Sequence, residues 1–245
     1  MPITQEVQDG IAEILIDVPP VNALKADDWF ALADELDGID DDVRVVIVRA
    51  EGRGFCAGVD IKELQADPAM IVDVNRGCAA AFAAVYECDV PVIAAVHGFC
   101  LGGGVGIAGS ADILIASDDA TFGLPEVDRG ALGAATHLAR LVPQQRMRAM
   151  LYTGETATAD ELYAYGSVLE VVKRGELEAA ARKVAEAIAA KHPTIIRRAK
   201  ESLNGIDPVD PRKSYRFEQG FTFELNVSGV ANEVRHTFGD DDGDA

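Results

Sequence analysis

The chain has 245 residues, of which 49% are hydrophobic, and 22 basic against 41 acidic side chains give it a formal net charge of −19. This length can bury the core of one large domain, or of a domain with an appendage, and so negative a molecule is a poor partner for nucleic acid or an anionic membrane. No stretch reaches the roughly 18 consecutive apolar residues of a membrane span, and the first residues show no basic segment followed by an apolar one, so we expect a soluble, cytoplasmic protein without a membrane partner.

The N-terminal part of the chain is expected to alternate strands and helices. Residues 3–7 and 11–18 flank Asp9-Gly10, a pair typical of tight turns, which predicts a hairpin of two edge strands. Apolar side chains recur at helical spacing over residues 27–36. Residues 43–50 then form an apolar run typical of a strand.

The middle of the chain carries two glycine-rich segments. The first, residues 51–64, closes on a short helical segment. The second follows an alanine-rich helix expected over residues 70–87 and a strand over residues 92–96, which is apolar throughout and therefore expected to be buried on both faces. The glycines of this second segment are Gly98, Gly102, Gly103 and Gly104, and a short buried helix is expected over residues 105–108.

A loop with several charged side chains follows. Residues 111–116 are strand-like, and Pro125 and Gly130 then frame a loop that holds Glu126, Asp128 and Arg129. From Ala134 onward the pattern is mostly helical. It includes one late strand, at residues 168–172, and a clear helix at residues 176–190.

The C-terminal part is expected to be helical and to begin near His192-Pro193, because proline disfavours helix in the residue before it. We therefore divide the chain into a core (1–191), a helical region (192–238) and a disordered acidic tail (239–245). The helical region carries too many apolar residues for a free-standing tail, so we expect it to pack on the core or on another subunit.

The glycine cluster is the first candidate for chemistry. A helix that begins after a glycine loop presents unpaired N–H groups, which suit a phosphate or a developing oxyanion. The segment 104–109 also satisfies the dinucleotide-binding pattern G-x-G-x-x-G. Only a few residues separate it from the next strand, however, whereas a β-α-β crossover needs roughly a dozen, so the spacing argues against a dinucleotide site.

Glu126 is the favoured acid–base residue, because its apolar neighbours predict a pocket in which its pKa would rise. The alternative is an ordinary glutamate of a surface loop. His97, beside the glycines, and His137 are less favoured candidates for a general base. Ser110 lacks the G-x-S-x-G pattern of a nucleophile and is expected to be a structural hydroxyl at a helix end.

Metal and disulfide chemistry have little support in the sequence. The four histidines show no metal-ligand spacing. The four cysteines show no C-x-x-C spacing and lie among apolar or small residues, so we expect buried free thiols at Cys56, Cys78, Cys88 and Cys100.

Taken together, the two glycine loops and the carboxylate resemble the enoyl-CoA hydratase/isomerase (crotonase) superfamily. The resemblance is carried by residues 55–64 (FCAGVDIKEL), 96–104 (VHGFCLGGG), 111–113 (ADI) and 120–126 (ATFGLPE). It implies an α/β fold in which repeated ββα units wind into a spiral, with a C-terminal helical region that forms homotrimers or dimers of trimers. It also implies an acyl-CoA substrate, with coenzyme A as part of the substrate and no metal or redox cofactor.

The resemblance places functional residues by motif position. The backbone N–H groups of Val59 and Gly103 would hold the thioester oxygen as it becomes an enolate. Coenzyme A would lie along Ala23, Leu24, Ala57, Asp60 and Ile61, and the other expected substrate contacts are Gly102, Gly106, Pro125 and Arg129. Glu126 and Asp128 would be the catalytic carboxylates.

One position departs from the family pattern. Hydratases of the family use two glutamates, one shortly after the glycines and one in the Pro-Glu loop, but here the first position is Gly106. Ordinary hydration of an enoyl-CoA is therefore disfavoured, and isomerisation of a double bond by one base stays open. Gly106 is also expected to leave room for a bulkier acyl group.

A narrower similarity points to the branch of the family that opens the last steroid rings in bacterial sterol catabolism. It rests on residues 75–78, 85–88, 125–137 and 215–226. Members of that branch hydrolyse a carbon–carbon bond in a bicyclic β-diketone CoA thioester, with a water activated by Glu126, Asp128 or a histidine. The alternatives are an enoyl-CoA isomerase or hydratase and a catalytically silent CoA-binding or RNA-binding relative.

Overall fold

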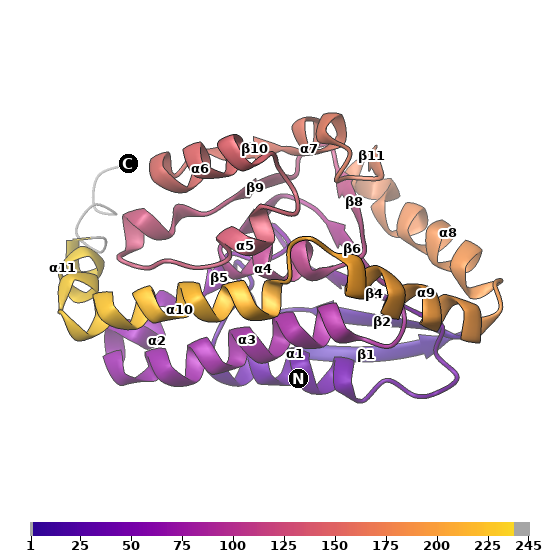
Figure 1. The fold of residues 1–245 in the computed structure, drawn as a ribbon, viewed down its shortest axis with the longest axis horizontal. Coiled ribbons are helices and arrows are strands. Elements are labelled where there is room, and N and C mark those ends of the chain that lie inside the picture. Colours follow the sequence, from indigo (N-terminus) through magenta and orange to yellow (C-terminus); the bar gives the residue numbers. More distant parts are fainter. Residues whose placement is uncertain (1, 238–245) are drawn as a thin grey trace.

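A six-stranded sheet forms the centre of the computed structural model, which describes residues 2–237 (Figure 1). The strands, in spatial order, are β1 (Ile3–Gln8), β2 (Ile11–Ile16), β4 (Val45–Ala50), β6 (Val92–Val96), β8 (Ile113–Ser117) and β11 (Glu170–Val172). Strands β1 and β2 are antiparallel, and every later neighbour pairs in parallel.

The expected hairpin is present, but only one of its strands is an edge strand. Asp9 and Gly10 both have positive φ angles, of 54° and 76°, as a tight hairpin turn requires. Strand β2 then pairs with β4, so that Ile11 lies opposite Val45. The expectation of two edge strands was therefore wrong for β2, because a sequence pattern does not reveal which partner a strand acquires.

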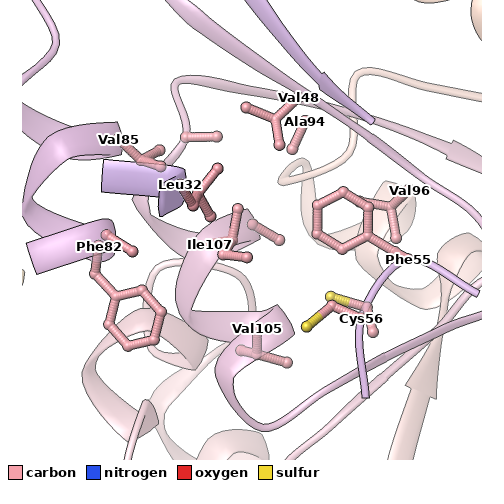
Figure 2. Packing of buried hydrophobic residues seen from close by; sticks show 14 of the residues in the cluster. Leu32, Val48, Phe55, Cys56, Phe82, Val85, Ala94, Val96, Val105 and Ile107 are labelled. Atoms are coloured by element: carbon pink, nitrogen blue, oxygen red, sulfur yellow. The ribbon is translucent and has the colours of Figure 1, made fainter. Parts of the chain in front are cut away.

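The central strands β4 and β6 are buried on both faces, as the apolar run at residues 92–96 predicted for β6. Val46, Val48, Ala94 and Val96 belong to one core, which they share with helices α1 (Ala26–Asp37), α3 (Ile71–Glu87) and α4 (Gly103–Ser110) (Figure 2). The side chains that alternate with them, including Val45, Ile47, Ile93 and Ala95, belong to a second core with helix α8 (Leu177–Ala189).

Short strands form a second layer that the sequence did not predict. They are β3 (Ala23–Leu24), β5 (Gly58–Val59), β7 (Phe99–Leu101), β9 (Thr121–Gly123) and β10 (Thr156–Thr158). Strand β3 pairs with β5, and β9 lies between β7 and β10. Each of β2, β4 and β6 is thus followed by a short strand and then by helix, a repeated ββα unit. Strands of two or three residues carry too little pattern to be recognised in a sequence.

The remaining helices lie close to their expected positions. Helix α2 (Ile61–Ala66) and the 3₁₀ helix η1 (Pro68–Met70) precede α3. Beyond Ala134 the chain forms α5 (Ala135–Leu138), α6 (Gln144–Thr153) and α7 (Ala159–Tyr165), and the 3₁₀ helix η3 (Arg174–Glu176) leads into α8. Strand β10 is the one element in that stretch that interrupts the helical pattern without a sequence signal.

The C-terminal helices begin at Pro193, where the break was expected. They are α9 (Pro193–Ile206), α10 (Pro211–Val227) and α11 (Val230–Thr237). Helix α10 lies along α3 (Figure 1), and the Gln219 side chain donates a hydrogen bond of 2.7 Å to the Asn75 carbonyl oxygen. This part therefore packs on the core. The boundary at residue 192 stays a prediction, and the tail at 239–245 lies outside the described residues.

Two other sequence expectations can be compared with the structure. The four cysteines are buried free thiols, as predicted. Among residues 2–237, one helical stretch, Pro68–Glu87, is long and apolar enough to cross a membrane by length and composition alone, but 56% of its apolar window is buried inside the protein. Such burial is typical of a core helix, and this stretch contains α3.

Candidate active site

A cavity of about 440 Å³ lies between strand β5, helices α2, α3 and α10, the start of α4 and the 3₁₀ helix η2 (Pro125–Arg129). The fold brings to this cavity residues that are widely separated in the sequence. Its wall includes the predicted site residues Ala23, Ala57, Val59, Asp60, Ile61, Gly102, Gly103, Pro125, Glu126 and Arg129. A volume of this size suits a small molecule or one end of a larger one.

The two segments predicted to hold the thioester oxygen lie side by side. A β-carbon built on Gly58 would lie 3.1 Å from the backbone nitrogen of Gly103, so strand β5 directly approaches the first turn of α4. Gly58 has a φ angle of 91°, a conformation that favours glycine. The backbone N–H groups at the start of α4 have no partner within their own helix, and they are therefore suited to an oxyanion.

Close packing explains the three consecutive glycines. A β-carbon on Gly103 would lie 2.6 Å from the Trp29 ring, and one on Gly104 would lie 2.6 Å from the carbonyl oxygen of Cys56. A β-carbon on Gly102 would overlap Oε1 of Glu126. Trp29 is fully buried and donates its indole N–H to the Leu24 carbonyl oxygen at 3.2 Å. Its ring is thereby held in place against Gly103. No role beyond its helix was predicted for Trp29.

Glu126 lies in η2 with its carboxyl group inside the protein. Its Oε2 atom is buried and has no hydrogen-bond partner among the described residues. Burial raises the pKa of Glu126 to about 8, with a further contribution from the negative charge of Glu218, while its own backbone N–H and Arg129 act in the opposite direction. The sequence predicted this raised pKa from the apolar neighbours. The carboxyl is mostly protonated at neutral pH and becomes a base at mildly alkaline pH.

Asp128 does not share this environment. It is exposed and absent from the cavity wall, and its carboxylate lies beside Gly154, where a β-carbon would be 2.7 Å from Oδ2. A catalytic role for Asp128 is therefore not supported. Two residues along a tight helical turn point to different sides, so the turn that buries Glu126 turns Asp128 outward.

Gly106 and Leu24 also differ from expectation. The ring of Phe82 fills the space beside Gly106, where a β-carbon would collide with it, so this position is not open to an acyl group. Phe82 itself forms part of the cavity wall. Leu24 is completely buried behind the wall, and its carbonyl oxygen accepts a 2.9 Å hydrogen bond from the backbone N–H of Asp60. Both residues shape the cavity without lining it.

Neither histidine proposed as an alternative base reaches the cavity. The His97 ring lies 3.2 Å from the Gly52 carbonyl oxygen, beside Arg174 in a separate pocket, and burial lowers its pKa. His137 packs against Phe82 and Tyr215, with ring centres 4.8 Å and 5.3 Å away, and burial lowers its pKa to about 3. Glu126 is thus better placed than either histidine to act as a base.

The hydroxyl of Ser110 donates a 2.8 Å hydrogen bond to the Gly106 carbonyl oxygen, the structural role expected for it. Asp60, the other carboxylate in the cavity wall, accepts the backbone N–H of Lys62 and caps α2. Within residues 2–237, no group of three or more His, Cys, Asp or Glu side chains is placed to hold a metal ion.

A third side of the cavity comes from α3 and α10, and no substrate contact was predicted for its residues. Asn75 and Cys78 on α3 and Tyr215 and Thr222 on α10 line this side. The spacing of Ile71, Val74, Asn75, Cys78 and Phe82 is helical, and that periodicity would have placed them on one face of α3. That this face borders a cavity follows only from the position of α10.

Glu218 fixes α10 against the start of α5. Its two carboxylate oxygens accept hydrogen bonds of 2.8 Å each from the backbone N–H groups of Ala135 and Thr136. The Thr222 hydroxyl donates to the Leu132 carbonyl oxygen in the segment between η2 and α5. The C-terminal helix therefore completes the cavity.

Comparison with known proteins relates the chain to one family and to two named relatives. Residues 6–221 match the model of the enoyl-CoA hydratase/isomerase family. The chain is 62% identical over 234 residues, covering 94% of this chain and 91% of the relative, to a protein of Rhodococcus jostii named (7aS)-7a-methyl-1,5-dioxo-2,3,5,6,7,7a-hexahydro-1H-indene-carboxyl-CoA hydrolase. It is 58% identical to a protein of the same name from Mycobacterium tuberculosis, with 97% of this chain and 98% of that relative covered.

A solved structure has the same architecture. An enoyl-CoA hydratase/isomerase from Xanthobacter autotrophicus Py2 superposes with a TM-score of 0.85 at 27% sequence identity, covering 92% of this chain and 87% of that chain. The ββα arrangement expected from the sequence is therefore the fold of this family.

Proposed function

Because the chain belongs to the enoyl-CoA hydratase/isomerase (crotonase) family, we propose that it hydrolyses a carbon–carbon bond in a bulky cyclic β-diketone carried as a CoA thioester, and so opens a ring during steroid catabolism. The observation that carries this proposal is the identity of 62% and 58%, over nearly the whole chain, to two proteins named as hydrolases of a bicyclic dioxo CoA thioester. The cavity supports it with one carboxyl, that of Glu126, beside two adjacent backbone segments, β5 and the start of α4.

In the proposed reaction the backbone N–H groups of Val59 and Gly103 hold the thioester oxygen. Bond cleavage pushes an electron pair toward the thioester, and two fixed donors stabilise the resulting charge without rearrangement of the site. The proximity of β5 to the start of α4 supports this pairing. Close packing against Trp29 would keep the second donor in place.

Glu126, once ionised, takes a proton from a water molecule as the water oxygen attacks the ring ketone carbon. The bond from that carbon to its ring neighbour then breaks, and its electron pair passes to the thioester oxygen. The proton held by Glu126 returns to the carbon skeleton, so the ring ketone becomes a carboxylic acid and one water is consumed. Water is the only co-reactant, so the reaction as proposed needs no metal or redox cofactor.

The coenzyme A portion would lie along β3, β5 and the start of α2, where Ala23, Ala57, Asp60 and Ile61 line the cavity. Contacts there would be made largely by backbone groups. Gly102, Pro125 and Arg129 would contact the acyl portion. The structure gives no support for direct contacts by Leu24, Gly106 or Asp128.

We also propose that the protein is a cytoplasmic homotrimer or dimer of trimers. The exposed apolar residues Phe217 and Phe221 form an edge-to-face pair on α10, with ring centres 5.2 Å apart, and are candidates for subunit contact. The net charge of −19 argues against a nucleic-acid partner.

Turnover of three CoA thioesters tests the proposed reaction: a bicyclic β-diketone ester, crotonyl-CoA and a 3-enoyl-CoA. The diketone ester should gain the mass of one water, and in ¹⁸O-labelled water the label should enter the new carboxyl group. Efficient hydration of crotonyl-CoA with an inert diketone would contradict the proposal. Conversion of the 3-enoyl-CoA without a change of mass, again with an inert diketone, would instead indicate an isomerase.

A further inference from the structure

The wall of the cavity formed by α3 and α10 contains an amide without a hydrogen-bond partner. Asn75 is 7% exposed, and its Nδ2 atom is buried with no partner among the described residues. Buried polar groups are nearly always hydrogen-bonded, because an unpaired one loses its contacts with water and gains none in return. An unpaired amide beside a cavity therefore needs an explanation.

The hydrogen bond between α10 and α3 does not explain why an asparagine side chain stands at position 75. The hydrogen bond from Gln219 reaches the backbone carbonyl oxygen of Asn75, and any residue at position 75 would offer that oxygen. The side-chain amide is thus not needed to hold the two helices together.

The polar neighbours of Asn75 also leave it without a role inside the protein. Burial, with a further contribution from the neighbouring Cys78, raises the pKa of the Tyr215 hydroxyl, so this phenol stays protonated. Both residues line the cavity with Asn75. Among the buried side-chain nitrogen and oxygen atoms that Asn75, Tyr215 and Thr222 contribute to this wall, the Asn75 amide nitrogen is the one without a hydrogen-bond partner within residues 2–237.

We propose that the Asn75 amide donates a hydrogen bond to a ring carbonyl oxygen of the acyl group, distinct from the thioester oxygen held by Val59 and Gly103. Rotation about the last side-chain bond, which is soft in asparagine, can direct Nδ2 into the cavity. The inference rests on the proposed function, because a β-diketone thioester carries such a second carbonyl.

The surroundings favour a neutral acceptor. Val74 and Phe82 line the cavity on either side of Asn75 along α3, and the Cys78 thiol and Tyr215 phenol remain neutral because burial raises both pKa values. The two cations that line the cavity, Lys62 and Arg129, belong to α2 and η2, so α3 and α10 offer a carboxylate no compensating charge, whereas a ketone needs only the single donor. Asn75 thus selects a cyclic ketone over an acyl chain with an acid at that position.

Binding of two CoA thioesters tests the proposal: a bicyclic acyl group with the ring ketone, and the same group with a methylene in its place. Both are titrated calorimetrically against Glu126→Gln protein, in which turnover is suppressed, and against Glu126→Gln combined with Asn75→Leu. The protein with Asn75 should bind the ketone about tenfold more tightly than the methylene compound, and Asn75→Leu should abolish the preference. An equal preference in both proteins would overturn the proposal.

Two further variants separate recognition from structure. Ile71→Val trims a neighbouring apolar contact on α3 and should weaken both ligands by the same factor. Because Nδ2 has no partner in the free protein, Asn75→Leu should unfold at the same temperature as its parent or higher, whereas a structural role would lower it. If Asn75→Leu fails to fold, Asn75→Ala must abolish the preference instead.

The binding preference is independent of turnover. If wild-type protein leaves the diketone ring intact, the proposed function fails while the comparison of ketone with methylene still decides the role of Asn75. If the ring is opened and the preference survives Asn75→Leu, the role of Asn75 fails alone.

Discussion

The Oε1 atom of Glu126 occupies the place that a β-carbon on Gly102 would take. The proposed base and the glycine before the first turn of α4 are therefore packed directly against each other. Gly102 also has a φ angle of 55°, which a residue with a side chain rarely adopts. The two residues depend on one another, although 24 positions separate them in the sequence.

Gly102→Ala should displace the Glu126 carboxyl and strain the backbone. We expect turnover to fall at least about tenfold and the free energy of unfolding to fall by about 1–3 kcal/mol. Steady-state kinetics and chemical denaturation measure the two effects. Gly175→Ala is the matched control, because a β-carbon there meets nothing within 4 Å. Equal behaviour of the two variants would contradict the packing relationship.

Glu126→Gln should lower kcat on the diketone ester by about 100-fold or more, because the amide cannot accept the proton of the attacking water. Asp128→Asn is the control and should keep activity within about twofold, since Asp128 is exposed and lies outside the cavity. Full turnover by Glu126→Gln would show that another group is the base. A large loss of kcat in Asp128→Asn would indicate that Asp128 takes part in catalysis after all.

The activity should depend on pH through Glu126. Because the ionised form is the base and the pKa is raised to about 8, kcat/KM should increase with pH and level off above that value. Glu218→Gln removes a negative charge that contributes to the raised pKa, so the midpoint should move to lower pH. A profile that is flat between pH 6 and 9 in both proteins would speak against Glu126 as the titrating group.

The same carboxyl should affect stability in the opposite direction. Its pKa in the folded protein, about 8, exceeds its ordinary value of 4.5, so between these values the folded state holds a proton that the unfolded state releases. Stability from this group therefore falls as the pH rises through that window. The melting temperature of Glu126→Gln minus that of wild type should therefore be larger at pH 8 than at pH 5. The reverse order would show that the carboxyl is not desolvated.

Gly106→Ala should destabilise the protein because its new methyl group would meet the Phe82 ring. Overpacking of this kind typically costs about 1–3 kcal/mol. Combining it with Phe82→Leu should recover part of the loss, and a double-mutant cycle in denaturant measures the coupling. Purely additive effects would indicate that the space beside Gly106 is open after all.

Some features of this protein could be read from the order of its residues. The apolar run at β6 predicted a strand buried on both faces, since a strand without alternation has no polar side to expose. Asp9-Gly10 predicted its turn, and the apolar neighbours of Glu126 predicted the raised pKa. These are local properties, in which the cause and the effect lie within a few residues. The family motifs then extended the prediction to the spiral of ββα units.

The tertiary structure decided which side chains meet. Asp128 follows Glu126 by two residues, yet the turn of η2 directs only Glu126 into the cavity. Gly106 was expected to leave open space, but Phe82 from α3 fills it. Asn75 and Tyr215 had no assigned role because the wall they form exists only where α10 packs on α3. The sequence by itself predicted the longer strands and helices and singled out Glu126 as the candidate base, while packing between distant segments determined the shape and polarity of the space around that carboxyl.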